Sequence, residues 1–323
     1  MPALASGTVG AAVPVPRVTE LRCGCFGAAR YIRRVQHIEF FHRAHFEKKY
    51  RRRHARKALS YFIDFFWETD FDELFTRYPQ GFTDALFPNL GYTYMINLGT
   101  PFVMQLGAER YPVKHDIFLP RQLPLLAEHA AGNRIFGIKF RVSPVVLEKT
   151  VNFSEYRASV HPLSYLIDKP LLQQVKSARS FDERVQLLSD HYGRIIERPT
   201  EARHPVPIVT GLLKDCGERR DFTTPIAELA AARGISARTL QRYFLATTGI
   251  TGKQALQILR IRTAVELLVS RPGDFRFEDF GYYDYSHFFK HLKQFLSPLS
   301  PEGGTLAGET SLAAALLKSA RTK

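Results

Sequence analysis

The chain has 323 residues, of which 45% are hydrophobic, and its formal net charge is +14. This length and composition allow two domains with separate cores, and they exclude a chain that is disordered throughout. No apolar run reaches the roughly 18 residues of a membrane-spanning helix, and the first residues lack the basic start and apolar stretch of a secretory signal. Three cysteines are too few for a disulfide framework. We therefore expect a cytoplasmic protein without a membrane partner.

The positive charge is concentrated near the N-terminus. Residues 1–60 contain 13 Lys and Arg against 3 Asp and Glu, whereas residues 61–210 contain 16 against 17. We predict that residues 1–58 form a basic, disordered tail. Two other interpretations stay open: an arm that adds salt-sensitive affinity for nucleic-acid phosphates, and an organellar transit peptide.

Residues 59–160 are predicted to form short strands. Every second residue from Phe136 to Val142 is apolar, and so is every second residue from Tyr92 to Leu98. This period of two is typical of strands with one buried face. Turn residues separate the segments at short intervals, which indicates a small sandwich or barrel.

Residues 163–198 have a helical pattern. Ser180 and Glu183 have the spacing of a capping box, in which each side chain accepts a hydrogen bond from the other residue's backbone N–H. Apolar residues follow at helical spacing from Val185 to Ile196, and the helix over 180–197 is a plausible dimer surface. Three prolines in the nine residues 199–207 then predict a stiff linker and a domain boundary.

Residues 224–248 have the spacing of two helices joined by a tight turn. Thr224 is predicted to cap the first helix and Pro225 to begin it. Ala230 allows close helix packing, Gly234 supplies a left-handed turn and Leu240 is apolar six residues later. Ser236 is a suitable cap for the second helix, in which Leu240, Phe244 and Thr247 are predicted to face inward.

Part of the second helix is predicted to be exposed. Arg238, Gln241, Arg242 and Leu245 recur at i, i+3, i+4 and i+7 on one side. Arg can bind guanine and Gln adenine through paired hydrogen bonds in the major groove. Spacing alone leaves two interpretations equally open, a base-reading surface and the solvated face of an ordinary helical hairpin.

Two segments carry a family resemblance. The stretch from Leu229 through Gly234, Ser236–Phe244 and Gly249 resembles the first helix-turn-helix of the AraC/XylS family of transcription regulators. A segment like the family's connecting helix follows, and Gly281–Lys290 with Ser300-Pro301 resembles its second recognition helix and closing motif. Together they cover roughly residues 208–303. Residues 59–198 more weakly resemble the cupin-like N-terminal domain of one branch of the family.

The resemblance implies a fold, a function and partners. The α+β fold would have a β-rich, cupin-like domain for effector binding or dimerisation (59–198), the Pro-rich linker (199–207), an all-α DNA-binding domain with two helix-turn-helix units (208–305) and a tail (306–323). The partners would be double-stranded DNA, a small-molecule effector, a second subunit and, for an activator, RNA polymerase. The DNA-binding residues would be Ser236, Arg238, Thr239, Gln241, Arg242, Tyr285, Ser286, His287 and Lys290.

The sequence departs from the family pattern at two places. Gly252 occupies a position where the family usually has proline. The segment from Leu268 to Gly281 is about two residues shorter than usual and contains Pro272-Gly273, which prevent a full leading helix in the second unit. We expect a short turn there. The second recognition helix is predicted to be capped by Asp284 but to be less well supported than the first.

Catalytic and metal sites are not expected. Cys23 and Cys25 with His37, His42 and His45 match no closed tetrahedral site. The His-x-His of a metal-binding cupin is missing, and so are phosphate-loop, dinucleotide and nucleophile-elbow motifs. His287 lies in a helical, aromatic setting that favours DNA contact or packing over catalysis. We therefore expect no enzyme activity and no cofactor.

Two rival functions stay open. One is a ligand-binding or enzymatic β domain attached to a degenerate helical domain. The other is a nonspecific nucleic-acid-binding protein that depends on the basic tail.

Overall fold

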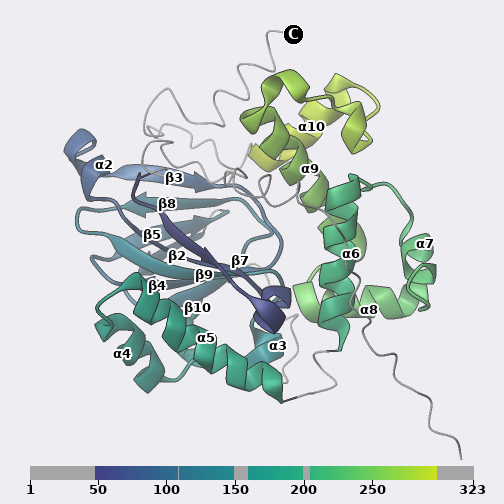
Figure 1. Cartoon of the computed structure of the whole chain (residues 1–323). Helices are drawn as coiled ribbons and strands as arrows, with labels where there is room; N and C mark the ends of the chain where they lie inside the picture. The colour runs from purple at the N-terminus through teal and green to yellow at the C-terminus, as the bar shows by residue number, and fades with distance from the viewer. Residues whose placement is uncertain (1–47, 108, 149–158, 199–203, 297–323) are drawn as a thin grey trace, which may run out of the picture. The chain divides into compact units, whose positions relative to one another are not determined.

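The computed structural model describes residues 48–107, 109–148, 159–198 and 204–296. Two antiparallel sheets make up the first part of the described chain, and helices make up the rest (Figure 1). The six-stranded sheet has the order β1 (Arg51–His54), β2 (Ile63–Asp70), β9 (Arg134–Phe140), β4 (Tyr92–Asn97), β7 (Ile117–Pro120) and β10 (His161–Pro162). The four-stranded sheet has the order β3 (Phe82–Leu86), β8 (Leu125–His129), β5 (Phe102–Leu106) and β6 (Glu109–Val113).

One apolar core joins the two sheets. Trp67 and Met95 of the six-stranded sheet belong to the same buried cluster as Met104 and Leu125 of the four-stranded sheet. The fold is therefore β-rich in its N-terminal part, as the alternating sequence pattern predicts.

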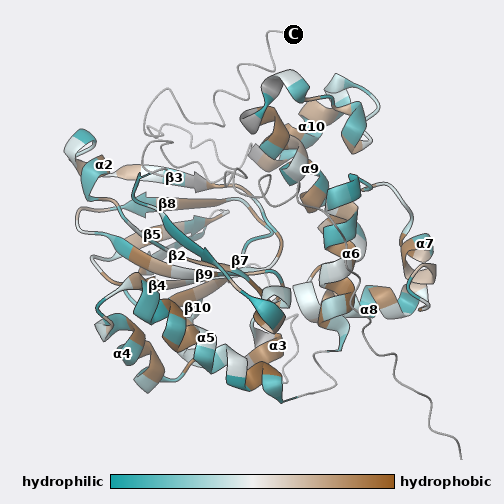
Figure 2. Ribbon diagram, viewed as in Figure 1, coloured by the Kyte–Doolittle hydropathy of each residue, from teal (hydrophilic) through white to brown (hydrophobic). Residues whose placement is uncertain are grey.

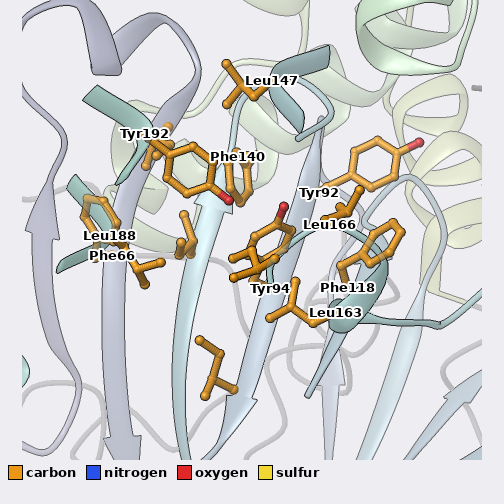
Figure 3. Close-up of a cluster of buried hydrophobic side chains, with 14 of the residues drawn as sticks. Phe66, Tyr92, Tyr94, Phe118, Phe140, Leu147, Leu163, Leu166, Leu188 and Tyr192 are labelled. Atoms are coloured by element: carbon orange, nitrogen blue, oxygen red, sulfur yellow. The ribbon is translucent and has the colours of Figure 1, made fainter. Parts of the chain in front are cut away.

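A second core lies between the six-stranded sheet and helices. It joins Phe66, Tyr94 and Phe140 of the sheet to Leu188 and Tyr192 of α5 (Phe181–Glu197), as Figure 3 shows. The short helices α4 (Lys169–Ser177) and η5 (Leu163–Tyr165) contribute further apolar side chains. The sheet is consequently covered on both faces, and every residue of β4 is buried. The predicted apolar faces of 92–98 and 136–142 are confirmed. The opposite faces are also buried, except at Arg141, which is exposed.

The central strand β9 shows what burial on both faces requires. Lys139, which the alternation places on the second face, is 3% exposed and donates to the backbone oxygen of Leu90 at 2.7 Å. At Gly137, a Cβ atom would lie 2.1 Å from the indole ring of Trp67. Only glycine leaves room for this tryptophan. The close approach therefore explains why the buried position 137 carries no apolar side chain.

Residues near both ends of the β-rich part depart from the predicted boundaries. Strand β1 pairs with β2, so residues 51–54 of the segment expected to be a tail belong to the sheet. The metal ligands considered at Cys23, Cys25 and the three histidines lie outside the described residues, as does the tail 306–323.

The predicted capping box at the start of α5 forms in part. Ser180 accepts from the Glu183 N–H as predicted, but Glu183 accepts from the Arg179 N–H rather than from that of Ser180.

The helical part begins inside the predicted linker. Pro205 and Pro207 form the first turn of α6, where a helix needs no N–H donors, so the helix starts three residues earlier than the boundary at 208. The helices are α6 (Pro205–Arg219), α7 (Ile226–Ala231), α8 (Ala237–Thr248), α9 (Gly252–Ser270), η7 (Pro272–Asp274), η8 (Glu278–Phe280) and α10 (Tyr285–Leu296).

The remaining short helices are η3 (Lys57–Tyr61), α2 (Asp72–Arg77) and α3 (Val145–Glu148). Apolar and polar residues alternate around the longer helices, as the colours of Figure 2 show. Within the described ranges, no helix has the length and hydropathy needed to cross a membrane.

Candidate nucleic-acid interface

The first helical unit consists of α7, a tight turn and α8. Gly234 has a φ of +67°, in the left-handed region that glycine adopts most easily. The Ile235 N–H returns to the backbone oxygen of Ala230 at 3.1 Å and closes the turn. Ala230, Leu240 and Phe244 are each 0% exposed, so the small residue and the two apolar residues form the contact between the helices.

The start of this unit differs from the prediction at Thr224. Helix α7 begins at Ile226, and the backbone oxygen of Pro225 accepts from the N–H groups of Glu228 and Leu229. The Thr224 hydroxyl instead donates to the Asp221 carboxylate at 2.8 Å. Thr224 therefore stabilises the preceding loop and does not cap the helix.

Helix α8 presents a cationic face. Ser236 accepts from the Thr239 N–H at 3.1 Å and caps the helix, as predicted. Arg238 and Arg242 are exposed one helical turn apart, and neither has an ion-pair partner within the described ranges. The Arg242 guanidinium carbon lies 5.8 Å from the centre of the Tyr243 ring, and no ion pair holds either guanidinium group away from a ligand.

Gln241 has a different environment from the two arginines. Its side chain is partly buried and its Oε1 accepts from the Gly252 N–H at 3.3 Å. The carboxamide therefore points toward the start of α9. Gly252 fits closely there, because a Cβ atom would lie 2.8 Å from Ile226 and 2.9 Å from Phe244.

Helix α9 connects the two units. Thr251 and Gln254 form a capping box at its N-terminus, with each side chain accepting from the other residue's backbone N–H. This pair was not predicted, although Thr followed three residues later by Gln is the usual signal of a capping box. At about 1.5 Å per residue, the 19 residues of α9 extend about 28 Å.

The segment before α10 contains two short 3₁₀ helices, η7 and η8, in place of an α-helix. This agrees with the expected effect of Pro272-Gly273. Phe280 is 0% exposed and lies between Phe222, at a ring distance of 6.3 Å, and Phe275, at 5.8 Å. Aromatic packing thus replaces part of the missing helix.

Arg260 of α9 ties this segment to the connecting helix. Its Nε donates to the backbone oxygen of Phe280 at 2.7 Å, and its guanidinium carbon lies 3.7 Å from the centre of the Tyr282 ring. Gly281, between these two residues, has a φ of +72°. One side chain therefore holds both sides of the turn that leads into α10.

Helix α10 carries the second set of predicted contacts. Asp284 accepts from the His287 N–H at 2.7 Å and caps the helix. Ser286, His287 and Lys290 are exposed. Tyr285 is partly buried against Phe277, and this burial raises the pKa of its hydroxyl.

Tyr283 was not singled out from the sequence, yet its side chain is 90% exposed immediately before this helix. The sequence contained a signal for this exposure: Tyr283 is a large aromatic residue just before the predicted cap Asp284 and lies outside the apolar period of the helix.

A partly buried histidine supports α10. The Nδ1 of His291 is 2.7 Å from the Tyr282 hydroxyl, and burial lowers the pKa of His291 to about 4, with smaller contributions from the charges of Arg260 and His287. The unfolded chain binds a proton near pH 6.5, whereas the folded chain does so only near pH 4. The contribution of His291 to the free energy of unfolding is therefore fully present above pH 6.5. It is lost progressively as the pH falls from about 6.5 to about 4.

We expect acidification from about pH 7 to about pH 5 to lower the free energy of unfolding by about 1–2 kcal/mol, after allowance for solvent screening at this partly exposed ring. Urea unfolding of His291→Gln should lose most of this pH dependence, since glutamine cannot be protonated. The exposed His115, which does not contribute to the pKa shift of His291, provides the control, and His115→Gln should keep the pH dependence. An unchanged pH profile in His291→Gln would contradict the assignment.

No metal-binding cluster of His, Cys, Asp or Glu occurs among the residues that the structure describes. No family model matches the sequence, and neither does any curated protein.

Solved structures do resemble it. ToxT from Vibrio cholerae O395 is 13% identical over 67% of this chain and 92% of its own, with a TM-score of 0.38. A second ToxT crystal form is 11% identical over 77% of this chain and 95% of its own, with a TM-score of 0.39. The AraC-like transcriptional activator CuxR is 9% identical over 62% of this chain and 82% of its own, with a TM-score of 0.27. AraC-like regulators are thus among the structures that this chain resembles. Because every TM-score is below 0.5, we base the function on the chain's own geometry.

Proposed function

We propose that this protein is a sequence-specific DNA-binding transcription regulator that places α8 and α10 in the major groove as recognition helices of two helix-turn-helix units. The observation that carries the proposal is the pre-formed α7–α8 unit, with its left-handed turn at Gly234, its buried contact at Ala230 and Leu240, and its free arginines. This arrangement fits the groove, which admits one α-helix and is read by forked guanidinium donors.

The proposed contacts differ in quality along α8. Arg238 and Arg242 are exposed and free of ion pairs within the described ranges, so they are the best candidates for base contacts. Thr239 and Ser236 lie at the helix N-terminus, where N–H groups and hydroxyls commonly bind phosphate. Gln241 can read adenine only if it leaves the Gly252 N–H, which makes its contact conditional.

The second unit is proposed to add contacts through Ser286, His287 and Lys290. Tyr285 is partly buried, so it supports the helix more than it reaches out, and the exposed Tyr283 takes its place as a candidate contact to the DNA backbone. Helix α9, about 28 Å long, suits two units that enter successive major grooves about 34 Å apart. The β-rich part is proposed to bind an effector, to pair subunits, or both.

Selection of the full chain against a library of random duplexes tests the proposal. We expect enrichment of one sequence motif, and we expect that motif to be bound in preference to its shuffled version at physiological salt. Binding without enrichment would reject a specific regulator and favour a nonspecific nucleic-acid-binding protein.

We expect the two halves of the selected motif to be unequal. The α8 unit is capped and fully packed, whereas the α10 unit follows two 3₁₀ turns and holds its position through aromatic packing and Arg260. Strong base preference should therefore occur in one half-site, with weak preference about one turn away. Arg242→Ala should reduce discrimination between sequences, and Lys290→Ala should mainly reduce salt-sensitive affinity. Equal discrimination in both halves would show that the shortened unit docks as well as the first.

A further inference from the structure

A polar cavity of about 230 Å³ lies at one end of the six-stranded sheet, outside the core between the sheets. Three elements build it: the start of β1, the adjoining ends of β2 and β9, and the N-terminus of α5. Its volume is smaller than the roughly 300–1,000 Å³ of pockets for drug-sized ligands, so it suits a compact ligand.

Cationic side chains dominate the lining. They are Lys49, Arg51, Arg134, Arg179 and Arg184, against the two carboxylates Glu68 and Asp70. Lys49 forms an ion pair with Glu73 at 3.2 Å, and Arg184 forms one with Glu68 at 3.0 Å. Arg51 also approaches Glu68, at 4.0 Å. Arg134 and Arg179 therefore remain without an ion pair in the described part of the chain, and Asp70 is the other carboxylate in the lining.

The floor of the cavity is a buried charge network. Arg184 is 6% exposed and donates from one terminal nitrogen to Glu68 and from the other to the backbone oxygen of Ala178, at 2.6 Å. Its Nε is buried and has no hydrogen-bond partner among the described residues. A buried guanidinium with an unused donor indicates a site that an acceptor group completes.

The first turn of the 17-residue helix α5 also lies at the cavity, with Ser180 and Phe181 in its lining. The two carboxylates of this turn already have partners: Asp182 accepts from Arg53, and Glu183 accepts from the Arg179 N–H. The positive end of a helix dipole and its backbone N–H groups favour anions. Arginine side chains beside a helix N-terminus are a common arrangement for phosphate, because both supply fixed donors.

We propose that this cavity binds the phosphate group of a small phosphorylated effector, with Arg134 and Arg179 as its principal ligands and Arg184 as the buried base of the site. The binding of the anion is independent of DNA, whereas its role as an effector rests on the proposed function. The site uses the sheet end and the start of α5, so a bound anion connects residues from β2, β9 and α5.

Isothermal titration of the full chain with inorganic phosphate tests the site, with chloride at matched ionic strength as the reference. We expect saturable binding to the wild type, and at least a roughly tenfold weaker affinity in Arg134→Gln and in Arg179→Gln. Both side chains are exposed, so these variants should fold like the wild type, which circular dichroism checks. Arg110→Gln is the matched control. Arg110 is an exposed arginine of the four-stranded sheet, where it pairs with Glu128 of the same sheet. This variant should bind phosphate like the wild type.

Two results would overturn the proposal. One is the absence of saturable heat with phosphate at millimolar concentration. The other is equal affinity in Arg134→Gln, Arg179→Gln and Arg110→Gln, which would place the anion elsewhere on this basic protein. The titration contains no DNA, and the library selection is run in a buffer without free inorganic phosphate. Failure of the site and failure of the DNA-binding proposal are therefore separate outcomes.

Discussion

The double variant Arg238→Ala/Arg242→Ala is expected to fold like the wild type and to lose most of its preference for the selected DNA motif. Each forked contact between an arginine and guanine is worth about 1–3 kcal/mol of discrimination. Two such contacts amount to about 2–6 kcal/mol, which is a loss of at least about 30-fold in the ratio of specific to random affinity. Competition binding with the selected and shuffled duplexes measures this ratio, and thermal unfolding checks that stability is unchanged.

A control must separate base reading from the loss of two positive charges. Lys169→Ala/Lys214→Ala removes the same charge from exposed positions in α4 and α6. This variant should keep the ratio of specific to random affinity. Its affinity for all duplexes should fall slightly, because it has two fewer positive charges to bind phosphates. If both double variants lose affinity equally for all sequences, Arg238 and Arg242 are phosphate contacts and the motif is read by other residues.

Leu240→Ala is expected to destabilise the protein by about 2–5 kcal/mol, because it removes a fully buried side chain and leaves a cavity. Leu240 is 0% exposed and belongs to the cluster that also contains Leu229, Ala230 and Phe244. Urea unfolding, read by circular dichroism, measures the loss. DNA binding should weaken only in proportion to the unfolded fraction.

Leu245→Ala is the matched control, since Leu245 lies on the same helix but is partly exposed. Its loss should be well below that of Leu240→Ala. Equal losses would mean that α8 does not pack in the manner described, and the pre-formed recognition unit would then lose its support.

The sequence predicted the features that depend on local chemistry. Glycine at 234 was expected because the turn needs a left-handed residue, and serine at 236 and aspartate at 284 because helix starts need acceptors. The apolar periods also placed Leu240 and Phe244 inside. Each of these inferences needs only the residue and its near neighbours, which a single sequence contains.

Features that depend on contacts distant in the chain could not be predicted. Arg184 pairs with Glu68, which is 116 positions away in the sequence, and no local pattern links the two. Arg260 looks like an ordinary polar residue of α9, yet it holds the turn before α10. Gln241 was assigned to the exposed stripe because helical spacing places it there, but that spacing carries no information about the Gly252 N–H that its side chain reaches.

The contact between Gln241 and Gly252 has a consequence for exchanging parts between proteins of this kind. Proline at 252 would have no N–H, so the Gln241 side chain would lose this partner. The Cβ of this proline would lie 2.8 Å from Ile226 and 2.9 Å from Phe244, so these side chains would have to shift. A chimera that receives α8 alone would therefore join a recognition helix to a neighbour that no longer matches it. The transplantable piece of this protein is the segment from α7 through the first turn of α9, and base preference and helix packing change together when it is cut shorter.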